Sequence, residues 1–172
     1  SGMTGWAEGG FSEKSSPAPL CLESLSEFFF ESLAISGRKG IAKTSWPLRV
    51  NPSSGNLHPT EAYLIAGPLA WRGGGIGTTC GDGVNGDAPA TFSGSPALYH
   101  YAPQSHSLEL LARVTEQSWR RLGLPDGAML LAFSSIYWRE SWKYGARAFR
   151  YCMLDAGHAL AAVAVAAGCL DW

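Results

Sequence analysis

The spacing of apolar residues predicts a helix at each end of the chain. Between Leu20 and Ile35, apolar side chains recur with the period of an amphipathic helix, and Ser36-Gly37 follows as a stop signal. Between Ala146 and Gly168, almost every residue after Asp155 is small or apolar, which predicts one long helix. The most apolar part of this helix is shorter than a membrane span, so we expect a buried core helix.

Shorter segments between these helices predict strands and connections. We expect strands, from their apolar, aromatic or alternating residues, at Glu61–Ala66, Ala97–Ala102 and Ala128–Phe133. Ser107–Leu122 has the apolar spacing of a third helix, whereas Gly37–Val50 is polar and irregular. Asn51–Pro59 is a turn-rich loop, and Trp138–Gly145 is a polar and aromatic connection. Because helices and strands are mixed without regular alternation, the expected fold class is α+β.

The length of 172 residues suits one domain with a hydrophobic core. We expect a loose leader over residues 1–19 and one domain over residues 20–172. Within that domain, residues 67–96 contain nine glycines and little apolar content. Such a segment buries too little surface to offset its ordering entropy, so we expect a weakly ordered insertion at the edge of a site.

Composition and charge exclude several classes of function. The net charge of −1 argues against a nucleic-acid surface or a basic membrane-binding face. None of the four cysteines forms a CxxC pair, so we expect buried thiols and no disulfide framework or zinc site. No secretory signal pattern is visible, and together these features favour a cytoplasmic location. His58, His100 and His106 lack the spacing of a metal site, so we expect no metal.

The first motif with chemical potential runs from Arg49 to Pro59 and reads RVNPSSGNLHP. Its small hydroxyls, amide and glycine suit a loop that reads the polar edge of a flavin at close range. The arginine suits a negative charge on a reduced ring or on a phosphate. The same residue types also make up an ordinary capped turn, and the motif by itself does not separate the two interpretations.

The second motif runs from Trp142 to Tyr151 and reads WKYGARAFRY. The ammonium of Lys143 would favour the phenolate of Tyr144, which could then take a proton while hydride leaves the substrate. The alternative is a solvated or ion-paired basic face, because Lys143, Arg147 and Arg150 have helical spacing. Further along, His158 follows Asp155 by three residues in an apolar run without a third metal ligand, so we interpret His158 and Gly157 as packing residues.

Taken in order, the segments PSSGNLHPTEAYL, ALYHY and WKYGARAFRYCMLDAGHALAAVAVAA resemble the SagB-type dehydrogenases of the nitroreductase superfamily. The match covers most of Leu20–Trp172, apart from Gly67–Pro96. The resemblance implies an FMN-dependent oxidoreductase that transfers hydride to or from flavin N5. It also implies a nitroreductase-like fold, in which an antiparallel sheet is packed with helices.

The resemblance further implies roles for individual residues. The residues expected to contact FMN are Arg49, Pro52, Ser53, Ser54, Gly55, Asn56 and His58. A Lys-Tyr pair implicated in azoline dehydrogenation matches Lys143 and Tyr144, which are therefore the candidate catalytic residues. Members of the family form intertwined dimers around FMN, so we expect a homodimer or pairing with a second nitroreductase-like module. The substrate would be a small molecule or a group derived from a peptide.

The chain departs from the family pattern in three places. It lacks the later strands and the basic segment that binds the FMN phosphate. A Gln-Asn pair of the long helix is replaced by Ala161-Ala162. The sequence DAGHA, followed after a short interval by a tryptophan, resembles a branch of the family whose long chains carry two nitroreductase-like modules. The sequence therefore leaves two further functions open, which are a general nitro or quinone reductase and a non-catalytic dimerisation or scaffold module of a longer chain.

Overall fold

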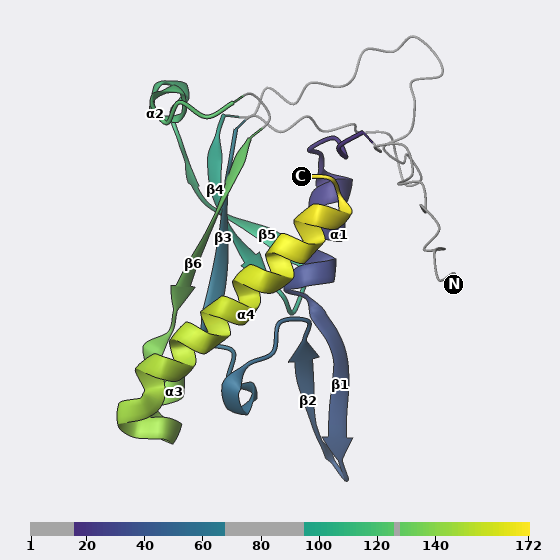
Figure 1. Ribbon diagram of the computed structural model, residues 1–172, viewed down its shortest axis with the longest axis vertical. Coiled ribbons are helices and arrows are strands. Elements are labelled where there is room, and N and C mark those ends of the chain that lie inside the picture. Colours follow the sequence, from purple (N-terminus) through teal and green to yellow (C-terminus); the bar gives the residue numbers. More distant parts are fainter. Residues whose placement is uncertain (1–15, 68–94, 126–127) are drawn as a thin grey trace, which may run out of the picture.

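The computed structural model describes residues 16–67, 95–125 and 128–172, and the molecule has an α+β architecture (Figure 1). Most of the predicted leader and of the glycine-rich insertion lies outside these residues. The centre of the fold is an antiparallel sheet with the strand order β5-β4-β3-β6. Its strands are β3 (Thr60–Ala66), β4 (Ala97–Ala102), β5 (Ser107–Arg113) and β6 (Met129–Ser135). The three predicted strands are thus confirmed, with β4 at the predicted bounds.

One face of the sheet carries the core. On β3, buried positions alternate with half-buried ones, so that Thr60, Ala62, Leu64 and Ala66 face inward. The long helix α4 (Ala148–Cys169) and the helix α1 (Leu22–Ser32) cover this face, and α4 crosses in front of the sheet in Figure 1. The buried cluster joins these elements through Leu25, Phe28, Phe29, Leu33, Ala62, Leu64, Tyr101, Ala159 and Ala166.

Both predicted end helices are confirmed, and they pack against each other near the C-terminus. Helix α1 places Phe28 and Phe29 in the core, and the Phe29 ring stacks on the Tyr101 ring at 4.4 Å. The Trp172 indole lies 5.4 Å from the ring of Phe28 and donates to the carbonyl of Ala18 at 2.7 Å. Residues that begin and end the described structure therefore help to bury the same end of the core.

The expectation of irregular structure at Gly37–Val50 is wrong, because this segment forms most of a two-stranded hairpin. Its strands are β1 (Ile35–Ile41) and β2 (Thr44–Arg49), paired antiparallel. Most positions of both strands are exposed or half-buried. A ribbon without a buried face requires no alternation of apolar and polar residues, so the sequence carries no strand period here.

The predicted helix Ser107–Leu122 is also wrong. Strand β5 occupies its first part, and only a short helix α2 (Glu116–Arg121) follows. Leu108 packs against the core, while Leu110 and Leu111 are exposed. The spacing of these leucines suits a helix, but hydrogen bonding to β4 makes the segment a strand. The hydroxyl of Thr115 accepts from the Ser118 N–H at 3.2 Å and caps α2.

The predicted connection Trp138–Gly145 is instead the helix α3 (Tyr137–Tyr144), which ends at Gly145 with φ of 55°. A single turn of 3₁₀ helix, η2 (Gly145–Arg147), joins α3 to α4. The segment Tyr137–Cys169 is long and apolar enough to cross a membrane by length and composition. Only 22% of its most apolar window is buried in the described structure, so the expectation of a buried core helix is wrong for most of α4. One side of the helix packs on α1 and β3.

The cysteines divide into two groups in the described structure. Cys152 is buried and free, and Cys169 is exposed and free. Cys21 is disulfide-bonded, so the expectation of unpaired cysteines is wrong for this residue. The cysteine content therefore no longer supports a reducing compartment.

Candidate functional site

The RVNPSSGNLHP loop connects β2 to β3 and contains one turn of 3₁₀ helix, η1 (Ser54–Asn56). Gly55, Asn56 and His58 all adopt positive φ, at 63°, 58° and 48°. Such a backbone suits glycine and asparagine, which explains why turn-forming residues gather here. The turn exposes Pro52 and Gly55, while Asn51 and His58 are buried.

Asp155 of α4 holds the front of this loop. Its carboxylate accepts from the Ser53 hydroxyl at 2.6 Å, the Ser54 hydroxyl at 3.0 Å and the Ser54 N–H at 3.0 Å. Asp155 is 1% exposed, so these hydrogen bonds lie in a dry environment where they are strong. The two serine hydroxyls that the sequence assigned to FMN are therefore donors to Asp155 in this structure. The acceptor role of Asp155 was missed, and the interpretation of Gly157 and His158 as packing residues is wrong, because both are exposed.

The two sequence motifs meet at Gly55. A Cβ atom placed on Gly55 would lie 2.5 Å from the Tyr144 hydroxyl and 2.7 Å from Lys143 Nζ. The positive φ favours glycine here, and a larger residue would also have to displace the ends of these two side chains. The ends of both side chains reach the same surface of the loop, although Lys143 and Tyr144 are adjacent in sequence. This convergence becomes possible where α3 ends and the backbone turns at Gly145.

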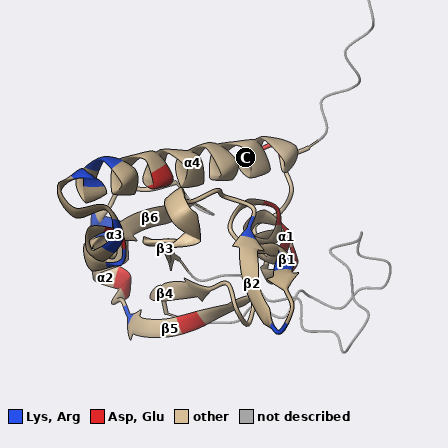
Figure 2. Ribbon diagram, turned by 90° about the horizontal axis from the view of Figure 1, so that it is seen from below, with Lys and Arg blue, Asp and Glu red and all other residues tan. Residues whose placement is uncertain are grey.

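The surroundings of Tyr144 are aromatic and basic. Its ring lies 4.3 Å from the ring of Tyr151, and Lys143 Nζ lies 5.5 Å from the Tyr144 ring centroid. Arg147 lies 6.0 Å from the Tyr151 ring in the same manner. Figure 2 shows that basic residues gather over α3 and the start of α4. A negatively charged group at this end of the molecule would therefore be stabilised.

The back of the loop is held by Asn56 and His58. The Asn56 amide donates to the carbonyl of Pro47 at 2.9 Å, and Asn56 Oδ1 lies 2.8 Å from His58 Nε2. Burial and the nearby guanidinium of Arg49 lower the pKa of His58 to about 4. His58 is therefore neutral near pH 7 and serves the loop as a hydrogen-bonding group.

Arg49 lies at the end of β2, against the sheet. One of its N–H groups approaches the carbonyl of Thr60 at 3.4 Å, and burial lowers the pKa of its guanidinium. Arg49, Asn51 and Thr60 line a cavity of about 10 Å³, which is room for one water molecule. The oxygen of Asn51 and the hydroxyl of Thr60 have no hydrogen-bond partner among the described residues. No described contact joins Arg49 to Lys143 or Tyr144, so the candidate residues form two clusters on one loop.

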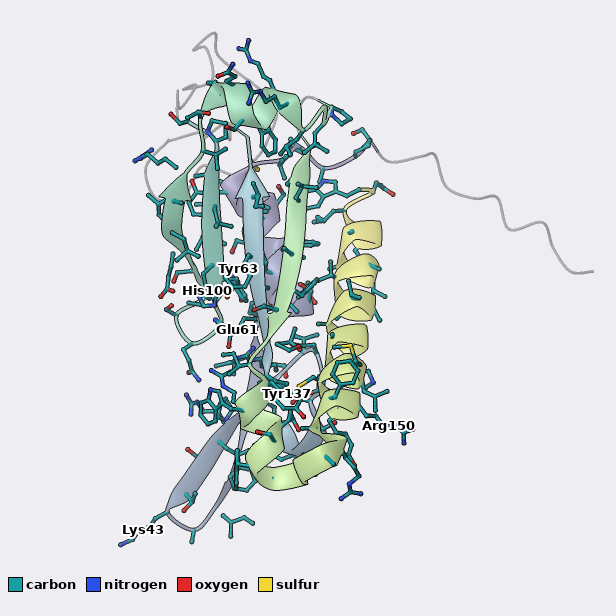
Figure 3. All side chains as sticks on the ribbon, turned by 90° about the vertical axis from the view of Figure 1, so that its left-hand side faces the viewer. Lys43, Glu61, Tyr63, His100, Tyr137 and Arg150 are labelled. Carbon is teal, nitrogen blue, oxygen red and sulfur yellow. The ribbon has the colours of Figure 1, made fainter. Side chains whose placement is uncertain are left out.

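A charged network that sequence reasoning missed connects the loop to the sheet. Arg139 of α3 donates to the carbonyl of His58 at 2.7 Å and to Glu61 at 2.8 Å. The other oxygen of Glu61 lies 2.8 Å from His100, whose second ring nitrogen lies 3.0 Å from Glu109. Figure 3 shows Glu61, Tyr63 and His100 side by side on the sheet. The alternation of β3 places Glu61 on the face opposite the core. This position is the feature of the sequence from which the network could have been predicted.

A hollow also lies away from the loop, between α1 and the turn that joins β4 to β5. It has a volume of about 330 Å³ and an apolar lining, with polar groups at Ser26, Tyr101 and His106. His106 bridges the Ser26 hydroxyl at 2.9 Å and the Tyr101 hydroxyl at 2.8 Å. This hollow contains none of the residues that the two motifs contribute.

The donor set on the loop fits FMN in some respects and departs from it in others. Lys143 supplies positive charge beside Gly55, and Arg147 supplies it beside the Tyr151 ring. The hydroxyls of Ser53 and Ser54 are already used by Asp155. The fit to a flavin therefore depends on the cationic side chains and the backbone more than on the serine hydroxyls.

Comparison with solved structures identifies the class of fold. The chain superposes with a TM-score of 0.64 and 26% identity on an Anabaena variabilis protein provisionally described as a nitroreductase, over 87% of this chain and 27% of that one. It superposes with a TM-score of 0.60 and 19% identity on a chain of the E. coli microcin synthetase McbBCD complex with truncated pro-MccB17 bound, over 99% of this chain and 61% of that one. The fold is therefore nitroreductase-like, as the sequence predicts.

The sequence comparisons add no closer relative. No protein-family model matches the chain, and no curated protein matches it significantly. The chain spans about a quarter of the Anabaena variabilis protein and less than two thirds of the microcin synthetase chain. It therefore corresponds to part of each of these larger proteins.

Proposed function

We propose that this chain belongs to an FMN-dependent oxidoreductase of the SagB dehydrogenase type. The observation that carries the proposal is the approach of Lys143 Nζ and the Tyr144 hydroxyl to Gly55. Two motifs that are far apart in the sequence, and that the family resemblance links to FMN and to dehydrogenation, thus meet on one loop. The nitroreductase-like fold of the solved structures supports the same reading.

In this proposal each residue has a defined task. FMN, when bound, supplies a two-electron acceptor or donor for hydride at N5. Tyr144, as a phenolate that the ammonium of Lys143 stabilises, takes the proton that leaves the substrate and becomes a neutral phenol. Gly55 lets the loop approach Lys143 and Tyr144, and Asn56 and His58 hold the turn behind it. Ser53 and Ser54 keep the loop in place through Asp155, and Arg49 balances negative charge on the cofactor.

A general nitro or quinone reductase of the same fold is the second candidate. The description of the Anabaena variabilis structure favours it. Such an enzyme reduces its substrate by hydride from the flavin and does not need a base for an outgoing substrate proton. The activity of Tyr144→Phe therefore separates the two, since it should fall with an azoline substrate and persist with a nitroaromatic compound.

A non-catalytic scaffold module is the third candidate. The use of both serine hydroxyls by Asp155 favours it. In that case the chain would bind no FMN even when joined to its natural partner. Absence of FMN binding in the complete protein would establish this candidate over the other two.

We further propose that α4 makes contact with a second protein module. Along α4, the large apolar side chains that are exposed are Phe149, Met153, Leu154, Leu160 and Val165. Large apolar side chains exposed along one helix are typical of an interface. The partner is a second copy of the chain or a second nitroreductase-like module. A monomer at micromolar concentrations in light scattering, from a chain that also fails to bind a second module, would contradict this.

A cytoplasmic location, which the sequence predicts, remains our proposal. The disulfide at Cys21 opposes it, because disulfides persist mainly in oxidising compartments. Mass spectrometry of the protein isolated under thiol-trapping conditions decides the point. A trapped free thiol at Cys21 supports the cytoplasm, and a disulfide at that position argues for an oxidising compartment.

The test of the main proposal is FMN titration followed by single-turnover flavin reduction with an azoline substrate, in the longest natural form of the protein. Lys143→Ala and Tyr144→Phe should each slow reduction by about 100-fold or more, the usual contribution of a general acid or base, while FMN stays bound. Lys39→Ala, on the exposed hairpin, is the matched control. Reduction at the parent rate in both site variants would exclude the pair as catalytic residues.

A further inference from the structure

Glu140 is a buried acid whose position no part of the proposed chemistry explains. It lies on α3 and is 0% exposed. Neither of its carboxyl oxygens has a hydrogen-bond partner among the residues that the structure describes. An ionised carboxylate in such a place loses its hydration without compensation, whereas a neutral carboxylic acid loses far less. The surroundings of Glu140 therefore favour its protonated form.

The groups that face Glu140 reinforce this preference. From α4, Asp155 and the thiol of Cys152 face it, and from its own helix Lys143 does so. Burial, followed by the negative charge of Asp155, raises the pKa of Glu140, and the Lys143 charge opposes this rise without cancelling it. Burial and the two carboxyl groups raise the pKa of the Cys152 thiol in the same direction.

The position of Lys143 is consistent with a neutral Glu140. Lys143 follows Glu140 by three residues on α3, a spacing at which acid and base on a helix readily form an ion pair. No such pair is present between these two residues. Lys143 Nζ instead lies beside Gly55 and the Tyr144 hydroxyl. The ammonium thus extends to the loop and leaves the nearest acid of its helix unpaired.

We propose that Glu140 is held as a neutral carboxylic acid and is thereby a positioning residue for Lys143, whose ammonium remains at Gly55. When Glu140 releases its proton to solvent, its carboxylate attracts Lys143 and draws Nζ away from the loop. The consequence for catalysis rests on the proposed function of Lys143 and Tyr144. The charge state of Glu140 and the response of Lys143 are independent of that function, and both can be measured without FMN or substrate.

The first measurement is the infrared C=O stretch of protonated carboxylic acids between pH 5 and pH 9. Ordinary glutamates are ionised over most of this range, since their pKa is about 4.3. We expect a band that persists to higher pH than the bands of ordinary glutamates, disappears in Glu140→Gln and remains in the matched control Glu31→Gln, which is exposed on α1. If the band that depends on Glu140 disappears together with those of ordinary glutamates, the residue is ionised with them and the proposal is overturned.

The second measurement is the NMR signal of the Lys143 ε-methylene group, assigned by its loss in Lys143→Arg. In the parent protein, this signal should shift over the same pH interval in which the infrared band disappears. In Glu140→Gln, it should stay constant over that interval, because the amide cannot ionise. A Lys143 signal that ignores the titration of Glu140 would overturn the positioning role even if the acid is neutral.

Flavin reduction in the longest natural form of the protein then separates this inference from the proposed function. The parent rate should fall as Glu140 ionises, and in Glu140→Gln the fall should move to higher pH. If FMN does not bind, the proposed function fails, while the infrared and NMR results still decide the state of Glu140. If FMN is reduced with the same pH profile in both proteins, Glu140 has no positioning role in the reaction.

Discussion

Ser54 and Asp155 are 101 residues apart in the sequence, and Asp155 accepts both the Ser54 N–H and the Ser54 hydroxyl at 3.0 Å. The Ser53 hydroxyl adds a third donor at 2.6 Å. The orientation of the loop is thus set by one carboxylate on α4. The approach of Gly55 to Lys143 and Tyr144 depends on that anchor, because all three residues lie beside the same turn.

Replacing the anchor should therefore release the loop. Asp155→Asn keeps the shape of the side chain but removes acceptor capacity and charge from a buried position. We expect a loss of about 2–4 kcal/mol in the free energy of unfolding, as is usual when a buried charge-assisted network is broken. Urea denaturation measures it, with the exposed Glu31→Gln as the control. Equal stability of Asp155→Asn and the parent would show that the hydrogen bonds do not hold the loop.

The contact at Gly55 can be tested separately from its backbone conformation. Gly55→Ala adds a Cβ that collides with Tyr144 and Lys143 and also strains a positive φ. Gly123 has a similar φ of 65°, with no atom within 4 Å of its Cβ position, so Gly123→Ala carries the backbone strain alone. We expect Gly123→Ala to cost about 1 kcal/mol and Gly55→Ala clearly more. Equal losses in thermal denaturation would mean that Tyr144 and Lys143 move aside freely.

The lowered pKa of His58 gives a pH dependence of stability. Because the folded pKa is about 4 and the unfolded value is 6.5, the unfolded chain binds the proton first as pH falls. Stability should therefore decrease between about pH 6.5 and pH 4 through this residue, by at most about 3 kcal/mol at 1.36 kcal/mol per pKa unit. His58→Asn should flatten this part of the curve of Tm against pH. An unchanged slope in His58→Asn would assign the acid sensitivity to other groups.

His100 should act in the opposite direction. Burial alone would lower its pKa, but the hydrogen bonds with Glu109 and Glu61 outweigh burial and raise it. Protonated His100 therefore stabilises the folded state below its unfolded pKa of 6.5, and this stabilisation is lost as pH rises through the folded value. We expect the difference in Tm between the parent and His100→Gln to shrink from pH 6 toward pH 9. A constant difference would show that His100 packs without a change in charge.

The sequence predicted correctly those helices and strands that bury one face. The segments Leu22–Ser32, Ala97–Ala102 and Ala148–Cys169 each bury one side, and their periods were legible in the sequence. The hairpin Ile35–Arg49 has no fully buried face, so its sequence carries no strand period. In β5, Leu110 and Leu111 are exposed, and the apolar spacing to which they contribute wrongly predicted a helix. Such strands form because they pair with a neighbouring strand, and the pairing partner cannot be identified from a short stretch of sequence.

The candidate site divides in the same way. The residue types of the loop and of the Lys143-Tyr144 pair pointed to a site, and the structure brings these two segments together at Gly55. The roles of Asp155, Arg139 and Glu140 were missed, because each depends on a contact between distant segments or on an absent partner. A lone acid inside the apolar run of α4 was the clue to Asp155. Burial of an acid is costly without donors, and the serine pair provides them.

The phase of α4 has a consequence for how the chain can vary. Cys152, Asp155, Ala159 and Ala166 are the buried positions of α4 that follow Ala148, and their spacing of three, four and seven places them on one stripe. The anchor of the loop is therefore part of the same helical register as the core. Inserting one residue between Asp155 and Ala159 would rotate one part of the stripe against the other by about 100°. The helix could then keep either its packing in the core or the hydrogen bonds of Asp155 to the loop, but not both. The number of residues between Asp155 and Ala159 is therefore fixed by both sets of contacts.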